Sequence, residues 1–199
     1  MADYKNLEAR IKVHEGFRNT VYLDSLNHKT IGWGHLCTKD EIWEEGKEYS
    51  EEEFRKVLEI NLVAPFQISR ALHPFLKHSG KASIINVASS AAIQDVGTGT
   101  PYAMSKSGLL QQSRSLAVEW AENGIRVNSV SPWFTKTPLT ETYLHNEEKM
   151  GSILKRTPLN RVAEADEIAS IITFLAMDKS SFVTGQNIVA DGGMSINAL

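Results

Sequence analysis

The pattern of hydrophobic and polar positions changes character near residue 50. Over residues 3–14, apolar side chains recur at helical spacing among charges, which predicts a short amphipathic helix. Two β-type runs then flank a polar turn at residues 25–29, which predicts a hairpin. The acidic stretch "CTKDEIWEEGKEYSEEE" is poor in apolar residues and is typical of a connector. The first part of the chain is therefore expected to be a small α+β helix–hairpin segment.

From residue 50 onward, the pattern alternates between helices and strands. Ser50 and Glu53 have the spacing of a capping box and predict the start of a helix that continues to about residue 76. The β-branched run "ASIINVAS" is typical of a strand buried on both faces. The remaining predicted elements are a helix over 101–124, a strand over 125–132, a helix over 164–177 and a short strand over 186–193. Such alternation predicts an α/β fold with a parallel sheet built from βαβ units.

Composition and charge narrow the class of protein. The chain has 199 residues, 42% hydrophobic and 23% charged, as in globular proteins. A formal charge of −3 without a basic run argues against nucleic-acid binding. Cys37 is the only cysteine, the N-terminus lacks an apolar signal core, and no apolar run is long enough to span a bilayer. We therefore expect a cytoplasmic protein with no membrane partner.

The stretch "TPYAMSKSG" contains the first candidate chemistry. Tyr102 and Lys106 stand four residues apart, so they share one face of the predicted helix. Tyrosine is a poor proton shuttle at neutral pH, and a nearby ammonium group favours its phenolate form. Ser89 follows a predicted strand and offers a hydroxyl that can stabilise charge on a substrate oxygen. The pair alone is equally compatible with an ordinary helix surface, and only the surrounding sequence favours the catalytic interpretation.

That surrounding sequence resembles a known family over residues 50–199. The matching stretches are "INLVAPFQISRAL", "SIINVASSAA", "YAMSKSG", "LAVEWAENGIRVNSVSPWFTKTPL" and "FVTGQNIVADGGMSIN". In this order they resemble the C-terminal part of a short-chain dehydrogenase/reductase of the tropinone-reductase-like group. The resemblance implies NADP- or NAD-dependent chemistry on a small-molecule carbonyl substrate.

The resemblance also assigns roles to individual residues. Tyr102 is expected to donate the proton, and Lys106 to support it and bind the nicotinamide ribose. Ser89 is expected to orient the carbonyl, and Asn61 to support a water relay to the lysine. The cofactor-binding set implied by the resemblance is Lys106, Tyr102, Pro132 and Thr137.

One part of that family's pattern has no counterpart in the sequence. A complete member begins with a strand, a glycine-rich turn and a helix whose N-terminus binds the pyrophosphate. Gly32 and Gly34 lack a third glycine, and Gly97 and Gly99 run directly into Pro101. We therefore expect a truncated Rossmann-like sheet in which residues 82–89 form an open edge, with impaired or absent cofactor binding.

The stretch "HEGFRNTVYLDSLNHKTIGWGHLCT" resembles the N-terminal lobe of phage-type lysozymes. By that resemblance Glu15 is a general acid, while Asp24 and Thr30 position the hydrolytic water. The predicted domains are thus 1–49 and 50–199, with the seam between about residues 46 and 58. Alternative functions are a peptidoglycan hydrolase and a non-enzymatic, engineered or chimeric scaffold. In a further alternative, the hairpin pairs with the open edge formed by residues 82–89 and substitutes for the missing part of the sheet.

Two further predictions concern association and metals. In the resembled reductases, helices corresponding to 52–76 and 101–123 pack against a partner subunit, which makes a homodimer possible. The apolar stripe on the second helix is equally compatible with an intrachain core, which we favour; it consists of Leu109, Leu110, Ser113, Leu116, Ala117 and Trp120. The six histidines are scattered without carboxylates at ligand spacing, so no metal site is predicted.

Overall fold

The computed structural model describes residues 18–23, 29–32, 35–36 and 50–197, and these form two separate sheets. The first is antiparallel and contains β1 (Arg18–Leu23), β2 (Lys29–Gly32) and β3 (His35–Leu36). Tyr22 lies opposite Thr30, so β1 and β2 form the predicted hairpin. Because none of these strands joins the second sheet, the expected opportunity for the hairpin to complete its open edge is not used.

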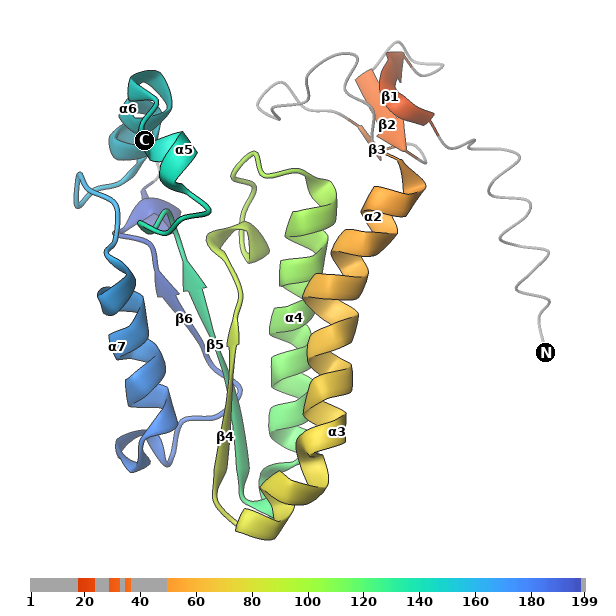
Figure 1. The fold of residues 1–199 in the computed structure, drawn as a ribbon, viewed down its shortest axis with the longest axis vertical. Helices are drawn as coiled ribbons and strands as arrows, with labels where there is room; N and C mark the ends of the chain where they lie inside the picture. Colours follow the sequence, from red (N-terminus) through yellow and green to blue (C-terminus); the bar gives the residue numbers. More distant parts are fainter. Residues whose placement is uncertain (1–17, 24–28, 33–34, 37–49, 198–199) are drawn as a thin grey trace, which may run out of the picture.

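The second sheet is parallel, as predicted, and has the order β4-β5-β6. Its strands are β4 (Ala82–Val87), β5 (Ile125–Pro132) and β6 (Asn187–Ala190). Helices α3 (Ala64–Ser79) and α4 (Thr100–Glu119) cover one face, and α7 (Ala165–Ala176) covers the other (Figure 1). The α/β fold with a truncated, Rossmann-like sheet is therefore confirmed.

The helix predicted from Ser50 to about residue 76 consists of three consecutive segments in the structure. The capping box is present: Glu53 N–H donates to Ser50 Oγ over 3.1 Å, and Ser50 N–H donates to the Glu53 carboxylate over 3.1 Å. These bonds hold the pKa of Glu53 below its usual value. Helix α2 (Glu51–Leu58) continues into a π-helical turn, η1 (Glu59–Val63), and then into α3. A π-helical turn inside a longer helix is a common feature of functional sites.

Two glycines meet at the amino end of the sheet. Gly80 ends α3 with φ of 63°, and Gly124 ends the short 3-10 helix η3 (Ala121–Asn123) with φ of 72°. The helix predicted over 101–124 is thus shorter in the structure, since α4 ends at Glu119 and η3 lies between it and Gly124. A Cβ at Gly124 would lie 2.2 Å from the carbonyl oxygen of Gly80. Only glycine permits both this backbone approach and the left-handed conformation.

The core lies between the sheet and its two helical layers. All six residues of the α4 stripe named above are buried within one chain, which confirms the intrachain interpretation. On the opposite face, Val130, Ile168 and Leu175 form a second buried cluster. A buried polar chain joins three elements, since Asn86 Nδ2 and Ser129 Oγ each donate to Ser113 Oγ over 2.8 Å. Buried polar groups of this kind are costly unless all are paired.

Two features differ from the sequence-based expectations. Helices α5 (Glu141–Leu144) and α6 (Glu147–Arg156) were not predicted. Strand β4 was expected to be fully buried, but most of it is only half-buried and Val87 is exposed, because one edge has no neighbouring strand among the described residues. The remaining 3-10 turns are η2 (Ser90–Ala92), η4 (Asp178–Ser180) and η5 (Met194–Ile196). None of the helices described is long and apolar enough to cross a lipid bilayer.

Candidate active site

The carboxyl ends of three parallel strands meet at one edge of the sheet. Strand β4 ends at Val87, β5 at Pro132 and β6 at Ala190. Ligands of open α/β sheets bind outside this edge, because loops and helix N-termini converge there. The predicted residues Ser89, Pro132 and Thr137 all lie at or just after these strand ends.

Tyr102 and Lys106 lie in the first two turns of α4, where Pro101 occupies the first turn. They share one face as predicted, with Lys106 Nζ 5.6 Å from the centroid of the Tyr102 ring. The ammonium group reaches the sheet and donates a hydrogen bond to the carbonyl oxygen of Val87 over 3.0 Å. Burial lowers the pKa of Lys106. The structure thus places a desolvated cation between a phenol and the end of β4.

Asn61 reaches the same part of α4 from the π-helical turn. Its Nδ2 donates to Ser105 Oγ over 3.3 Å, and Ser105 Oγ donates to the carbonyl oxygen of Tyr102 over 2.7 Å. The two helices approach closely because Gly108 leaves room for Leu62, which a Cβ at Gly108 would contact at 2.9 Å. The structure therefore links Asn61, through Ser105, to the backbone of Tyr102, in the turn of α4 that leads to Lys106.

Ser105 is a site residue that sequence reasoning missed. It is fully buried and joins the side chain of Asn61 to the backbone of Tyr102. The available signal was its place within "YAMSK", three residues after the tyrosine, on the flank of α4 that faces the preceding helix.

Ser89 follows β4 and forms the N-cap of η2. Its Oγ accepts a hydrogen bond from Ala91 N–H over 3.2 Å. The neighbouring Ser90, for which no role was predicted, is fully buried and donates to the carbonyl oxygen of Pro132 over 3.1 Å. Ser89 is thus the half-buried hydroxyl at this strand end, while Ser90 ties β4 to β5.

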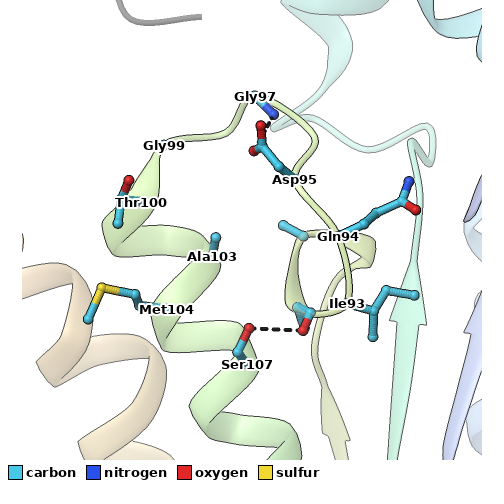
Figure 2. A pocket seen from close by; sticks show the side chains of 11 residues that line it. Ile93, Gln94, Asp95, Gly97, Gly99, Thr100, Ala103, Met104 and Ser107 are labelled. Carbon is cyan, nitrogen blue, oxygen red and sulfur yellow. Dashed lines mark hydrogen bonds between the residues drawn. The ribbon is translucent and has the colours of Figure 1, made fainter. Parts of the chain in front are cut away.

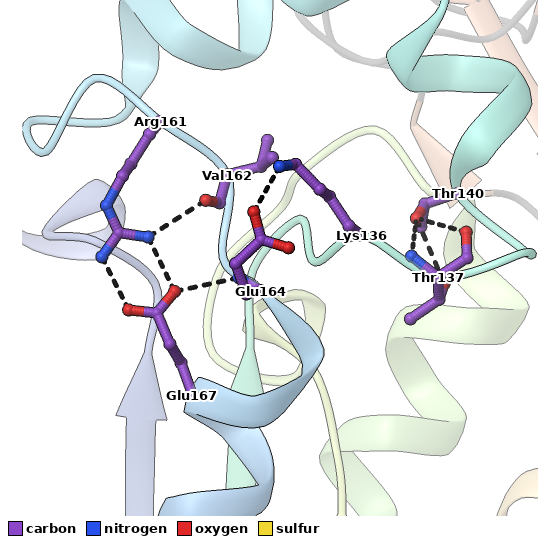
Figure 3. A network of polar contacts seen from close by, with 7 residues as sticks. All are labelled: Lys136, Thr137, Thr140, Arg161, Val162, Glu164 and Glu167. Carbon is purple, nitrogen blue, oxygen red and sulfur yellow. Dashed lines mark hydrogen bonds and ion pairs between the residues drawn. The ribbon is translucent and has the colours of Figure 1, made fainter.

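The loop that carries Thr137 is fastened to the start of α7 (Figure 3). Thr137 N–H donates to Thr140 Oγ1 over 3.1 Å, and the Lys136 ammonium pairs with the Glu164 carboxylate. Beside them, Arg161 makes two hydrogen bonds of 2.7 Å to Glu167. The Arg161 guanidinium, assisted by the backbone N–H of Glu164, lowers the pKa of Glu167 to about 2. The Lys136–Glu164 pair thus holds the segment between β5 and α5 against the amino end of α7, while Arg161 fastens the residues before α7 to its first turn.

A cavity of about 540 Å³ lies against α4 and the loop that follows β4 (Figure 2). Thr100, Ala103, Met104 and Ser107 line it from the helix, and Ser107 Oγ donates to the carbonyl oxygen of Ala92 over 2.9 Å. Tyr102 and Lys106 are not among its lining residues. The catalytic candidates therefore use the face of α4 that meets the strand ends, and this cavity lies on another face.

The residues of the lysozyme resemblance are only partly visible in the structure. Glu15 and Asp24 lie outside the described residues, whereas Thr30 belongs to β2, opposite Tyr22 in one neighbouring strand and Leu36 in the other. Their predicted roles remain predictions. In the part of the chain that the structure describes, no group of histidine, cysteine, aspartate and glutamate side chains has the arrangement of a metal site.

Comparison with known proteins decides which family this chain belongs to. A family model described as enoyl-(acyl carrier protein) reductase matches residues 31–195, most of the chain. The chain belongs to the short-chain dehydrogenase/reductase family. A tropinone reductase homolog from Arabidopsis thaliana is 43% identical over 150 residues, which cover 75% of this chain and 57% of the relative. Senescence-associated protein 13 from the same plant is 35% identical over 197 residues, which cover 99% of this chain and 71% of the relative.

Solved structures of the short-chain dehydrogenase/reductase family share the fold. The 4-hydroxyisoleucine dehydrogenase complexed with NADH is 36% identical, with a TM-score of 0.72 over 74% of this chain and 61% of that chain. A gluconate 5-dehydrogenase from Burkholderia cenocepacia, in complex with NADP and tartrate, is 27% identical, with a TM-score of 0.72 over 75% of this chain and 59% of that chain. The chain therefore spans roughly three fifths of these proteins.

The comparisons do not support a lysozyme component. The family-model match begins at residue 31, inside the segment that the lysozyme resemblance covers. The two-part division at residues 49 and 50 stays a prediction.

Proposed function

We propose that this chain carries the proton-transfer half of an NAD(P)-dependent carbonyl reductase site. The observation that carries the proposal is the Tyr102–Lys106 face of α4, whose ammonium group is desolvated and directed at the carboxyl end of β4. A cation held beside a phenol favours the phenolate, which makes the phenol a better proton donor to a developing alkoxide. The nicotinamide cofactor, when bound, supplies the hydride.

The other site residues complete this assignment. Ser89 hydrogen-bonds the substrate oxygen, and Asn61 supports the relay of a proton toward Lys106 through water. Pro132 at the end of β5, and Thr137 in the loop that follows, would contact the nicotinamide end, and the Lys136–Glu164 ion pair holds this loop in place. The substrate class is a small carbonyl compound, in keeping with the dehydrogenases that share the fold.

The described residues fit one end of the cofactor better than the other. Groups suited to the nicotinamide and its ribose lie at the strand ends, but β4 is the last strand on its side of the sheet as described. No strand–glycine turn–helix unit is found among these residues to place backbone amides on the pyrophosphate. We therefore expect weak cofactor binding and low turnover from this chain alone.

Titration with NADPH and NADH, followed by nicotinamide fluorescence, tests the assignment. Saturable binding that is weakened at least tenfold by Lys106→Ala and unchanged by Lys155→Ala supports the ribose role, since Lys155 is exposed on α6. Turnover of a carbonyl panel should then be abolished by Tyr102→Phe and retained in Tyr143→Phe, which changes an exposed tyrosine on α5. Binding that is indifferent to Lys106, or turnover that survives Tyr102→Phe, would overturn the proposal.

A further inference from the structure

The hydroxyl group of Ser105 can satisfy its two contacts with its proton in one position only. Its Oγ lies 2.7 Å from the carbonyl oxygen of Tyr102, which can only accept, so the hydroxyl proton is directed there. The other contact, 3.3 Å from Nδ2 of Asn61, must therefore be donated by Asn61 and accepted by Ser105. Ser105 is fully buried, so water does not compete for either contact.

This hydroxyl decides which way the side-chain amide of Asn61 faces. One end of an asparagine amide, Nδ2, can only donate, and the other end, Oδ1, can only accept. If the amide were reversed, Oδ1 would lie beside an oxygen that has no proton left to give, and a buried hydrogen bond would be lost. Nδ2 is therefore held against α4, and Oδ1 is directed away from Ser105.

Lys106, the next residue of α4, needs an acceptor for the water that solvates it. Its ammonium group can only donate, and one of its protons is bonded to the carbonyl oxygen of Val87 over 3.0 Å. A water that solvates the other protons must accept from Lys106 and donate its own protons onward. An amide oxygen can accept such a proton, whereas an amide nitrogen cannot.

We propose that Ser105 is a positioning residue for the proton relay, because it holds Asn61 so that Oδ1, rather than Nδ2, binds the water that solvates Lys106. The inference rests on the proposed function and adds to it the orientation of one relay group. The proton that Tyr102 gives to the substrate oxygen is replaced from solvent, by way of this water and Lys106. Asn61 and Ser105 neither gain nor lose a proton, and Ser105 acts only through Asn61.

Ser113 supplies a matched control on the same helix. Like Ser105, it is buried and donates to a carbonyl oxygen of the preceding turn, that of Leu109 over 2.8 Å. It also accepts a hydrogen bond from an asparagine amide, that of Asn86 over 2.8 Å. It lies about 12 Å further along α4, by the usual rise per residue. Ser113→Ala therefore removes an equivalent buried hydroxyl group away from the site.

Hydrogen exchange of the Asn61 side-chain amide, followed by NMR, tests the orientation without cofactor or substrate. In the unsubstituted chain, one Nδ2 proton of Asn61 should exchange with solvent about tenfold more slowly than those of the exposed Asn146. Ser105→Ala should remove this protection. Ser105→Thr, which keeps a hydroxyl group, and Ser113→Ala should retain it.

Titration of Lys106, followed by lysine ¹³Cε NMR, tests the bound water. Burial lowers the pKa of Lys106, and no charged group among the described residues adds to that shift, so its titration reports on its solvation. Ser105→Ala and Asn61→Ala should each lower this pKa further, and the double variant should lower it no more than either single one. Ser113→Ala should leave it unchanged.

Carbonyl turnover separates this inference from the proposed function. If the proposed function is correct, Ser105→Ala should lower kcat about tenfold with little change in KM, and Ser105→Thr should restore it. Turnover that is lost in Tyr102→Phe but unaffected by Ser105→Ala would overturn the role of Ser105 alone.

A chain without any turnover would overturn the proposed function, and the two NMR measurements then decide the role of Ser105 by themselves. An Asn61 amide that exchanges as fast as that of Asn146 in the unsubstituted chain would refute the orientation, even if Ser105→Ala did not fold. A Lys106 titration that is the same in Ser105→Ala and Ser113→Ala would refute the link to the relay water.

Discussion

The backbone of Gly80 lies so close to Gly124 that substitutions at the two glycines can measure how much this contact contributes to the free energy of unfolding. Both residues have a left-handed φ, 63° and 72°, which costs a residue with a Cβ about 1–2 kcal/mol. Their surroundings differ, because a Cβ at Gly80 has nothing within 4 Å, whereas one at Gly124 lies 2.2 Å from Gly80 O. That oxygen belongs to the backbone and cannot move without displacing the end of α3.

The substitutions Gly80→Ala and Gly124→Ala should therefore have unequal effects. We expect Gly80→Ala to lower the free energy of unfolding by about 1–2 kcal/mol. Gly124→Ala adds overpacking against backbone, which costs about 1–3 kcal/mol more. Since 1 kcal/mol shifts Tm by about 2–4 °C in a chain of this size, the two variants should differ by several degrees.

Urea denaturation, followed by the fluorescence of buried Trp120 and by far-ultraviolet circular dichroism, measures both variants. Equal losses would refute the reasoning, because they would show that the backbone approach adds nothing to the conformational strain. A larger loss for Gly80→Ala would refute it as well.

Three other predictions concern the polar contacts. Ser113→Ala should cost about 1–3 kcal/mol in urea denaturation, because it leaves the buried Asn86 amide and Ser129 hydroxyl without their shared partner; Ser115→Ala, an exposed serine on α4, is the control. Glu167 has its folded pKa lowered to about 2, so the stability it contributes is present above its unfolded pKa of about 4.3 and is lost as pH falls toward 2. Glu167→Gln should flatten the pH dependence of the urea midpoint over that range, and an unchanged profile would contradict the ion pair's role. Lys106 should titrate below the usual range of a lysine in ¹³Cε NMR spectra, because burial lowers its pKa, and stability should increase with pH between its folded and unfolded pKa values; titration of Lys106 at the usual lysine value of about 10.4 would count against the desolvation.

Local patterns in the sequence predict the main elements of the parallel unit. The strand expected over 125–132 is Ile125–Pro132 in the structure, and the Ser50–Glu53 capping box forms with both of its hydrogen bonds. Both features depend on residues that are close together in the sequence, so a local pattern is enough to predict them. Helices α5 and α6 were not predicted because the residues that form them are mostly polar. In α6 only Ile153 is buried, so there is almost no periodic pattern of apolar residues to indicate a helix.

The candidate site was predictable in its residue types and less so in its contacts. Tyr102 and Lys106 share a face because helical spacing requires it. The bond from Lys106 to Val87 depends on the phase of β4, which tertiary packing decides. The π-helical turn that carries Asn61 lies where Leu62 packs against Gly108, a contact between residues far apart in the chain. Neither can be read from a local pattern.

Because all three strands of the parallel sheet run the same way, each enters at one end of the molecule and leaves at the other. Gly80 and Gly124, whose contact affects stability, lie where β4 and β5 begin. Ser89, Tyr102 and Lys106 lie at the other end, near the carboxyl ends of the strands. A protein engineer can thus alter thermal tolerance at the entry end and reactivity at the exit end with separate sets of substitutions. Changes made at opposite ends should combine additively, since sites this far apart share no partners.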